Sequence, residues 1–327
     1  MAAWLAITPA KLRWLAWPRS HAPHGVRKRY FGPPDPVQHY YEAVRIKPDG
    51  RKRYLGCPKR ELKEVQRKIL RGILEKLPPP PRAHAYCRGR SSLTNAREHV
   101  GHAVVVHLDL SHFFNSINVR RVVGLFAALG YPRPVAVTLG LLCTYQVHPE
   151  VGWEFFNRYR RVVHRGLPQG APTSPALSNL ICQRLDRRLS GLARRFHARY
   201  TRYADDLTFS GNRDFAKGLE NFLKMARRII AEERFVLSER KLRIARKGSR
   251  QCVTGIVVND QPGVGRTQRR RLRAILHHCG RGRPEEQNRG KEENFRGYLQ
   301  GWVSYVGMVN PAQGQKLQSA LERVRWP

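Results

Sequence analysis

The sequence has few acidic residues for its size. Its 327 residues include 24 Asp and Glu against 61 Lys and Arg, which gives a formal net charge of +37. This excess of positive charge makes a polyanion the expected partner, and nucleic acid is the commonest one. The hydrophobic content of 41% is enough for a folded core, so a disordered chain is excluded. A ribosomal or histone-like structural binder is still compatible with these numbers.

Cysteines and long apolar runs are also scarce. The six cysteines are spaced singly, which excludes a dense disulfide framework and indicates a reducing compartment. His277-His278-Cys279 is interpreted as a helix end rather than a metal site, because adjacent side chains point in different directions. The run from Val135 to Tyr145 is shorter than the roughly 20 residues that cross a bilayer. We therefore expect a cytoplasmic protein with no membrane partner.

The N-terminal part contains a predicted helix, a linker and a basic hairpin. Leu5 to Trp17 has helical apolar spacing, and the Pro- and Gly-bearing segment 18–36 predicts a linker. Lys47-Pro48-Asp49-Gly50 contains a turn signal between two short strands and predicts a hairpin over residues 43–56. A helix over residues 62–77 follows, with apolar positions every three or four residues.

Three aspartates lie at the ends of predicted strands. Val104 to Leu110 is rich in β-branched residues and carries Asp109 near its end. Asp205 and Asp206 lie between short apolar flanks that can pair as a hairpin. Because adjacent carboxylates repel each other, a fold that holds both near a third needs cations. Such a cluster is typical of phosphoryl transfer with two Mg²⁺ ions, whose preferred ligands are carboxylate oxygens.

A loop from Gly166 to Pro175 lies between the two acidic segments and leads into a predicted helix over residues 177–189. Three motifs resemble those of reverse transcriptases and occur in the same order. They are the Asp109 strand with two following phenylalanines, the Pro-Gln-Gly loop that ends in Thr-Ser-Pro, and the Tyr-Ala-Asp-Asp string. The resemblance covers nearly the whole chain. It implies an α+β right-hand polymerase with fingers, a palm of antiparallel sheet plus helices, and a small helical thumb.

The same resemblance implies a division of the chain. Residues 1–36 would form an N-terminal helical arm and linker, and residues 37–100 the fingers. Residues 101–260 would form the palm, with a fingers insertion at about 120–165. Residues 261–327 would form a thumb that binds RNA. The activity implied is RNA-directed DNA synthesis.

The resemblance assigns the chemistry to a few side chains. Asp109, Asp205 and Asp206 would bind two Mg²⁺ ions, with Mn²⁺ as an alternative, and Leu110 would add its backbone carbonyl. Lys241 matches the lysine thought to protonate the pyrophosphate leaving group, which makes it a candidate general acid. A phosphate-facing surface lysine is the alternative interpretation of Lys241.

Four residues are implied in binding dNTPs. Phe114, five residues after Asp109, matches the bulky residue that blocks a ribose 2′-hydroxyl, with core packing as the alternative. Gln169 matches a residue near the incoming nucleotide. Lys47 and Arg53 lie on the basic hairpin and are the expected triphosphate contacts, because a flexible Lys and a forked Arg suit phosphate oxygens.

Two further strings narrow the resemblance to the retron-type bacterial reverse transcriptases. Asn95-Ala96-Arg97-Glu98-His99 precedes the first catalytic strand, and Val253-Thr254-Gly255 follows the acidic hairpin. Asn95, His99 and the Val-Thr-Gly string are expected to bind RNA. The resemblance implies a cognate structured noncoding RNA, priming from a guanosine 2′-hydroxyl, and branched RNA-linked single-stranded DNA (msDNA). It also implies anti-phage defence with a separate effector protein.

The C-terminal part has its own signal for RNA. A dense basic face there is predicted to contact RNA through Arg266, Arg269, Arg270, Arg271 and Arg273. Trp302 and Tyr305 follow, and they either stack on unpaired bases or pack between helices. The helical spacing around Trp302 favours the core for that residue.

Other classes of protein stay open on the sequence alone. Intron-type, CRISPR-associated and diversity-generating reverse transcriptases share the catalytic motifs, although the Ser174-Pro175 ending disfavours the diversity-generating class. An inactive RNA-binding relative is the non-enzymatic alternative. The intact aspartates disfavour it, because a pure binder gains nothing from three anions in a phosphate channel.

Overall fold

The computed structural model describes residues 1–16, 39–46, 50, 52–147, 165–282 and 284–326. The chain divides into two compact units that interleave along the sequence. Unit 1 comprises Met1–Tyr86, Leu110–Arg188 and Arg227–Leu237, and unit 2 comprises Cys87–Asp109, Leu189–Ala226 and Ser238–Pro327. The predicted linker at 18–36 lies outside the described residues. The division into fingers, palm and thumb does not coincide with these units and stays a prediction.

Unit 1 begins with two short helices, α1 (Ala2–Leu5) and α2 (Pro9–Ala16). The single helix predicted from Leu5 to Trp17 is therefore wrong. Ala6 adopts a left-handed conformation with φ 51° and ends α1. Pro9 is the first residue of α2. Proline lacks a backbone N–H, and at this position an N–H would have no hydrogen-bond partner within the helix.

The predicted basic hairpin of unit 1 is confirmed. Strands β1 (Tyr40–Ile46) and β2 (Lys52–Pro58) pair antiparallel, with Arg45 opposite Arg53. Helix α3 (Arg60–Gly72) follows and buries its apolar stripe. It ends earlier than the predicted residue 77, because the chain tightens into the short 3₁₀ helix η1 (Leu74–Lys76).

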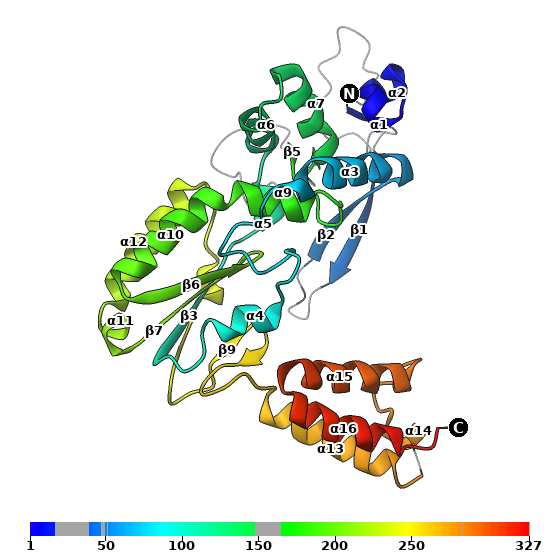
Figure 1. The fold of residues 1–327 in the computed structure, drawn as a ribbon, viewed down its shortest axis with the longest axis vertical. Coiled ribbons are helices and arrows are strands. Elements are labelled where there is room, and N and C mark those ends of the chain that lie inside the picture. Colours follow the sequence, from blue (N-terminus) through cyan, green and yellow to red (C-terminus); the bar gives the residue numbers. More distant parts are fainter. Residues whose placement is uncertain (17–38, 47–49, 51, 148–164, 283, 327) are drawn as a thin grey trace. The chain divides into compact units, whose positions relative to one another are not determined.

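The rest of unit 1 is largely helical (Figure 1). Its elements are α5 (Phe113–Ser116), α6 (Val119–Ala128), α7 (Arg133–Cys143), β4 (Tyr145–Gln146), β5 (Arg165–Gly166), α9 (Ser174–Ile181) and the first part of α10 (Gln183–Arg195). The helix predicted over residues 177–189 is divided at Cys182, between α9 and α10. Gly166 has no room for a side chain, since a Cβ there would lie 2.4 Å from the Asn115 carbonyl oxygen.

Unit 2 contains a four-stranded antiparallel sheet. The strand order is β6 (Ala198–Tyr203), β7 (Asp206–Gly211), β3 (Val104–Asp109) and β8 (Arg243–Arg246). Strand β3 lies inside the sheet, and Val104, Val105, Val106 and Leu108 are each at most 1% exposed. Its β-branched sequence suits a strand with neighbours on both sides, so the predicted strand and hairpin are both confirmed.

An aromatic cluster fixes the next helices to the sheet. Helices α11 (Arg213–Lys217) and α12 (Leu219–Glu232) are separated at Gly218. The centroid of the Phe222 ring lies 4.8 Å from the ring centroid of Phe209 on β7 and 5.0 Å from that of Phe215. Asn212 holds the N-cap position of α11, and Asp214 lies in its first turn.

A second core in unit 2 joins segments distant in sequence. Its members come from β3 and from α4 (Ser92–Arg97), β9 (Cys252–Val253), β10 (Ile256–Val257), α13 (Arg266–Cys279), α15 (Phe295–Val309) and α16 (Pro311–Glu322). Helix α14 (Pro284–Gln287) lies between α13 and α15 in the chain. Helices α15 and α16 approach closely at Gly307 and Gly314, where an added Cβ on Gly314 would lie 2.2 Å from the Gly307 Cα. The C-terminal helical segment, α13–α16, is thus packed on the same core as α4.

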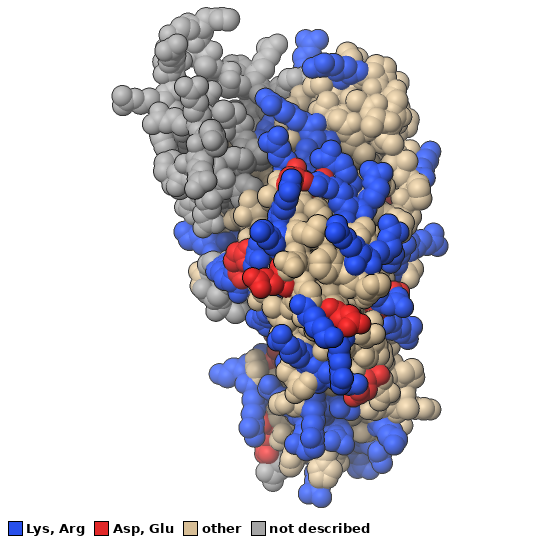
Figure 2. Space-filling view, turned by 90° about the vertical axis from the view of Figure 1, so that its left-hand side faces the viewer, with Lys and Arg blue, Asp and Glu red and all other residues tan. Residues whose placement is uncertain are grey.

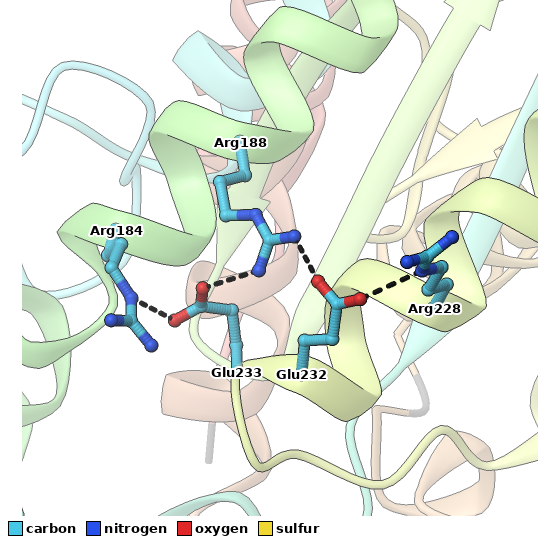
Figure 3. Close-up of polar contacts among 5 residues, drawn as sticks. All are labelled: Arg184, Arg188, Arg228, Glu232 and Glu233. Atoms are coloured by element: carbon cyan, nitrogen blue, oxygen red, sulfur yellow. Dashed lines mark hydrogen bonds and ion pairs between the residues drawn. The ribbon is translucent and has the colours of Figure 1, made fainter.

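Five charged side chains hold α10 and α12 side by side (Figure 3). The Nε of Arg184 and the Nη1 of Arg188 each donate to Glu233 at 2.8 Å. Arg188 also pairs with Glu232, to which the Nε of Arg228 donates at 2.8 Å. Burial alone would raise the pKa of Glu233, but the hydrogen bonds from Arg188 and Arg184 outweigh it and lower that pKa. The hydrogen bonds from Arg188 and Arg228 likewise lower the pKa of Glu232.

The mixture of helices and antiparallel strands confirms the α+β prediction at this level. None of the helices in the described ranges is long and apolar enough to cross a membrane.

Candidate active site and nucleic-acid surfaces

The paired strands β3 and β7 bring two of the predicted aspartates together. Asp109 ends β3 and Asp206 begins β7, and the two residues lie directly opposite each other in the antiparallel register. Asp205 lies in the two-residue turn between β6 and β7, where Ala204 takes a left-handed φ of 57°. The fully buried Arg202 donates from Nη1 to the Ala204 carbonyl at 3.3 Å, which supports this turn.

Lys241 forms an ion pair with Asp109, one of the two facing aspartates. Its Nζ lies 2.7 Å from Oδ2 of Asp109. The lysine ends the short 3₁₀ helix η2 (Glu239–Lys241), just before β8 pairs with β3. The N–H of Ser238 also donates to the Asp109 carbonyl at 2.8 Å, so the segment before Lys241 is tied to the same strand end. Lys241 therefore lies beside Asp109, whereas its role in proton transfer stays a prediction.

The electrostatics of the facing aspartates differ from those of an ordinary surface acid. Burial, followed by the charges of Asp205 and Asp109, raises the pKa of Asp206 to about 7, and Lys241 acts in the opposite direction. Asp206 as a residue is nevertheless exposed to solvent, whereas Asp109 is only 9% exposed. Repulsion between such carboxylates falls when a cation binds between them or beside them.

The aspartates fit a divalent cation by their chemistry. Carboxylate oxygens are hard ligands that Mg²⁺ and Mn²⁺ prefer. Binding of such an ion would stabilise the ionised form of Asp206, which burial and the charges of Asp205 and Asp109 disfavour. In the described ranges, no group of three or more His, Cys, Asp and Glu side chains has its ligand atoms already gathered for a metal. The three carboxylates are thus not a completed ligand set. Leu110, predicted to add its carbonyl, follows Asp109 directly and is 1% exposed.

The predicted nucleotide-binding residues belong to unit 1. Phe114 is partly exposed. The centroid of its ring lies 5.3 Å from that of the Phe113 ring and 6.2 Å from that of the Tyr86 ring. Gln169 is half-buried in a loop that the Ser174 hydroxyl closes by donating to the Pro168 carbonyl at 2.7 Å. Arg53 is exposed on β2. Lys47 lies outside the described residues.

Two of the predicted RNA-binding residues near α4 are buried instead. Asn95 and His99 are each 0% exposed. The His99 ring hydrogen-bonds through Nδ1 to the Ser210 hydroxyl and through Nε2 to the Thr201 hydroxyl, both at 2.7 Å. Because these partners lie on β7 and β6, His99 ties the segment after α4 to the two strands whose connecting turn contains Asp205. Direct RNA contact by Asn95 and His99 is therefore a wrong prediction for this structure.

The Val-Thr-Gly string packs against the same helix. Val253 is 0% exposed, so its predicted RNA contact is also wrong. The Thr254 hydroxyl donates to the Ser92 carbonyl at 3.0 Å, and the residue has a left-handed φ of 48°. Gly255, with φ 83°, is exposed. The two strings thus form one structural element, and Gly255 is its solvent-facing part.

The arginines of α13 provide a basic surface. On the face drawn in Figure 2, blue Lys and Arg side chains spread over the described surface with few red acidic ones between them. Arg266, Arg270, Arg271 and Arg273 are exposed. Arg269 is half-buried, and its Nη1 donates to Oε1 of Gln313 on α16 at 2.9 Å. Arg269 therefore serves partly as a contact between helices.

Two cavities flank α13. One is a groove of about 690 Å³ toward α16, lined by basic residues that include Arg266, Arg273 and Lys316. The other is a pocket of about 340 Å³ toward the segment 287–298. Four of the five arginines predicted to contact RNA line the groove, whereas Arg271 lines the pocket, which no sequence signal predicted.

The aromatic residues of α15 have divided roles. Trp302 and Tyr305 are partly buried against the C-terminal core, which confirms the core assignment of Trp302. Tyr298, one helical turn before Trp302, is 39% exposed and lines the smaller pocket. Sequence reasoning missed Tyr298, although its place just outside the apolar stripe of α15 could have indicated an exposed ring.

Comparison with known proteins identifies the relatives of this chain. The family model of reverse transcriptase (RNA-dependent DNA polymerase) matches residues 46–275. The chain is 45% identical over 295 residues to the retron Mx65 reverse transcriptase of Myxococcus xanthus, covering 90% of this chain and 67% of that protein. It is 38% identical over 333 residues to the retron Mx162 enzyme of the same organism, covering 97% and 64%. It is 32% identical over 288 residues to the retron Ec86 reverse transcriptase of Escherichia coli, covering 87% and 80%.

Proposed function

Because the chain belongs to the reverse transcriptases, the RNA-dependent DNA polymerases, and within them to the retron type, we propose that it copies a cognate structured noncoding RNA into single-stranded DNA. Synthesis starts from a guanosine 2′-hydroxyl of that RNA and leaves branched RNA-linked DNA, the msDNA. The product acts in anti-phage defence together with a separate effector protein. The relatives above carry retron names, which supports this assignment over intron-type, CRISPR-associated and diversity-generating enzymes.

The observation that carries the proposal is the register of β3 and β7, which sets Asp109 opposite Asp206 beside Lys241. These aspartates, with Asp205 and the Leu110 carbonyl, would hold two Mg²⁺ ions. Bound Mg²⁺ would activate the attacking hydroxyl and stabilise the charge on the departing pyrophosphate. The raised pKa of Asp206 supports this role, because a cation stabilises a buried carboxylate and relieves the repulsion from Asp205 and Asp109 that adds to the effect of burial.

Lys241 has the chemistry and the position for proton transfer to the leaving group. Its ammonium lies 2.7 Å from Asp109, so it is held beside the reacting centre by a charge-assisted hydrogen bond. In the proposed reaction Lys241 leaves Asp109 and donates its proton to the pyrophosphate. The inactive RNA-binding alternative gives no reason to keep this arrangement.

Residues of unit 1 select and hold the dNTP in this proposal. Phe114 excludes a ribose 2′-hydroxyl, and the nearby Tyr86 ring supports its orientation. Gln169 lies near the incoming nucleotide, and the positive φ of 121° at Gly170 gives its loop a sharp turn. Arg53 and Lys47 contact the triphosphate, since guanidinium and ammonium groups bind phosphate oxygens well.

The exposed arginines of α13 hold the RNA. Arg270, Arg271 and Arg273 face solvent, and the adjoining groove toward α16 has no acidic residue in its lining. Gly255 is the part of the two retron-type strings that can approach RNA directly, and Asn95, His99 and Val253 support it from inside. The dense positive charge makes this binding depend on salt, because each phosphate contact releases counterions.

The test is to purify the protein from its native host and sequence the nucleic acid that stays bound. Parallel samples are treated with RNase, DNase or a 2′-5′ debranching enzyme. The proposal predicts RNA-linked DNA of one fixed sequence that the debranching enzyme releases. Linear complementary DNA alone would keep the polymerase and contradict the retron mode of priming.

A further inference from the structure

Helix α13 presents different chemistry on its two sides. The groove of about 690 Å³ toward α16 is lined by seven Arg and Lys residues, with neither an acidic residue nor a Phe, Tyr or Trp ring. Such a lining suits phosphates. The pocket of about 340 Å³ on the other side combines two aromatic rings, two amide side chains, two arginines and one glutamate. This mixture suits a flat group with donors and acceptors on its edge rather than a phosphate.

The aromatic wall of the pocket is formed by α15. The rings of Phe295 and Tyr298 are nearly parallel, with 15° between their planes and 6.3 Å between their centroids. Phe295 is fixed from behind, because it packs on the C-terminal core and its ring meets that of Trp326 edge-on. Tyr298 is 39% exposed. An ordered but accessible tyrosine ring is a stacking platform for a base, and every base has a face that can use it.

The polar wall is formed by the segment between α14 and α15. The Nδ2 of Asn288 donates to the Glu292 carbonyl at 2.8 Å, and Oδ1 of Asn288 accepts from the Glu292 N–H at 2.9 Å. This pair closes the loop, so Gln287, Gly290 and the Glu292 side chain line the pocket on a fixed backbone. Amide and carboxylate groups read the edges of unpaired bases.

The third wall links the pocket to the phosphate groove. Arg271 lines the pocket, whereas its neighbours Arg270 and Arg273 line the groove on the other side of α13. Successive helical residues point about 100° apart, so one helix turn presents cations to both cavities. A nucleic-acid strand crossing α13 can therefore place phosphates in the groove and an adjacent base in the pocket.

We propose that the pocket formed by Arg271, Gln287, Phe295 and Tyr298 binds a single unpaired nucleobase of RNA, stacked on the Tyr298 ring. The inference rests on the proposed RNA binding by α13 and deepens it, since it separates base recognition from phosphate binding. It gives the C-terminal helical segment a means to distinguish a bulged or looped RNA from a continuous duplex.

The experiment compares binding of two short single-stranded RNAs that differ by one abasic site. Each is offered to the full-length wild-type protein, to Tyr298→Leu and to Tyr298→Trp, and the Kd values are measured by fluorescence anisotropy. Removing the base should weaken wild-type binding about tenfold, as expected for the loss of one base–aromatic stack. Removing the base should have little effect on the Kd of Tyr298→Leu. Tyr298→Trp should show the same ratio of Kd values for the two RNAs as the wild type. Tyr41→Leu, which changes another exposed tyrosine, is the matched control and should behave as wild type.

The salt dependence separates this inference from the proposed function. Arg273→Gln should reduce the log–log slope of affinity against salt by about 0.7, the value for one contact to a single strand, and keep the abasic effect. Tyr298→Leu should leave the slope unchanged. Salt-dependent binding with equal abasic effects in wild type and Tyr298→Leu would overturn the pocket alone. Binding that neither salt nor Arg273→Gln alters would overturn RNA binding by α13 itself.

A second measurement uses the unaltered protein and so does not depend on a variant that folds. RNA containing one 4-thiouridine is bound to the wild type and irradiated, and the cross-linked peptide is identified by mass spectrometry. Cross-links at Phe295 or Tyr298 support the proposal. Cross-links confined to other segments would overturn it.

Discussion

Two adjacent pairs of acids in this chain have opposite electrostatics. Glu233 and its neighbour Glu232 face arginines from two helices, and the pKa values of both are lowered. Asp206 faces Asp109 across two strands, follows Asp205 in sequence, and has a pKa raised to about 7.

The comparison shows that the pattern of two adjacent acids does not determine their role. Arginines satisfy the glutamates within the fold, so that pair joins α10 to α12. Asp109 instead pairs with the ammonium of Lys241, a flexible group that can leave. The raised pKa of Asp206 shows that burial and carboxylate repulsion outweigh the effect of this ammonium at the aspartates.

The largest effect is expected from removing charge at the two adjacent aspartates. Asp205→Asn and Asp206→Asn should each reduce DNA synthesis on a primed RNA template by about a thousandfold or more, because charge stabilisation in the transition state is lost. The rate is measured by primer extension, with RNA binding determined separately. Glu232→Gln is the control and should retain wild-type turnover. If either asparagine variant kept wild-type rates, the catalytic role of these aspartates would be wrong.

The next largest effect is expected at Lys241. Lys241→Met should lower kcat about a hundredfold, the usual contribution of a general acid, and leave the KM for dNTP nearly unchanged. Single-nucleotide incorporation at a series of dNTP concentrations provides both constants. A rise in KM with normal kcat would instead support a phosphate-facing lysine.

At the satisfied pair the effect should fall on stability. The Glu233 side chain is 2% exposed and accepts from two arginines, so Glu233→Gln should reduce the free energy of unfolding by about 2 kcal/mol. Glu232→Gln should reduce the free energy of unfolding by less, because Glu232 is exposed and solvent screens its ion pairs. Urea unfolding monitored by circular dichroism measures both. Equal losses in the two variants would contradict the distinction between them.

A smaller effect concerns pH. The pKa of Asp206 is raised from 3.8 to about 7 on folding, so the folded state binds this proton more tightly than the unfolded state. The stability of the metal-free protein should therefore fall as pH rises from about 4 to 7 and level off above that. Asp206→Asn removes this dependence, so its Tm should exceed that of the wild type by a margin that grows to a few degrees over the same range. A margin that shrinks with rising pH would contradict the assignment of the shift.

Much of the fold follows from local patterns in the sequence. The β-branched run of β3, the turn signal between β1 and β2, and the apolar period of α3 each indicate the element that forms. The helix break at Cys182 was missed, because the apolar period of residues 177–189 continues across it.

Residues of the candidate site could be predicted where a short motif indicates the chemistry. They could not be predicted where the hydrogen-bond partners of a residue come from distant segments of the chain. Asp109, Asp205 and Asp206 were singled out by their motifs, and the strand register places Asp109 opposite Asp206. The partners of His99, in contrast, lie more than 100 residues away on β6 and β7, so nothing in its own string indicates that it is buried. Tyr298 was missed for the converse reason, since its exposure depends on how α15 packs on the core.

The most direct test of the distinction between the two acidic pairs is metal binding itself. Mn²⁺ is titrated into the RNA-free wild type, Asp206→Asn and Glu232→Gln, and the free ion is measured by electron paramagnetic resonance. The account predicts the same Kd for Glu232→Gln as for the wild type and an affinity at least about tenfold weaker for Asp206→Asn. Equal affinities in the wild type and Asp206→Asn would contradict it.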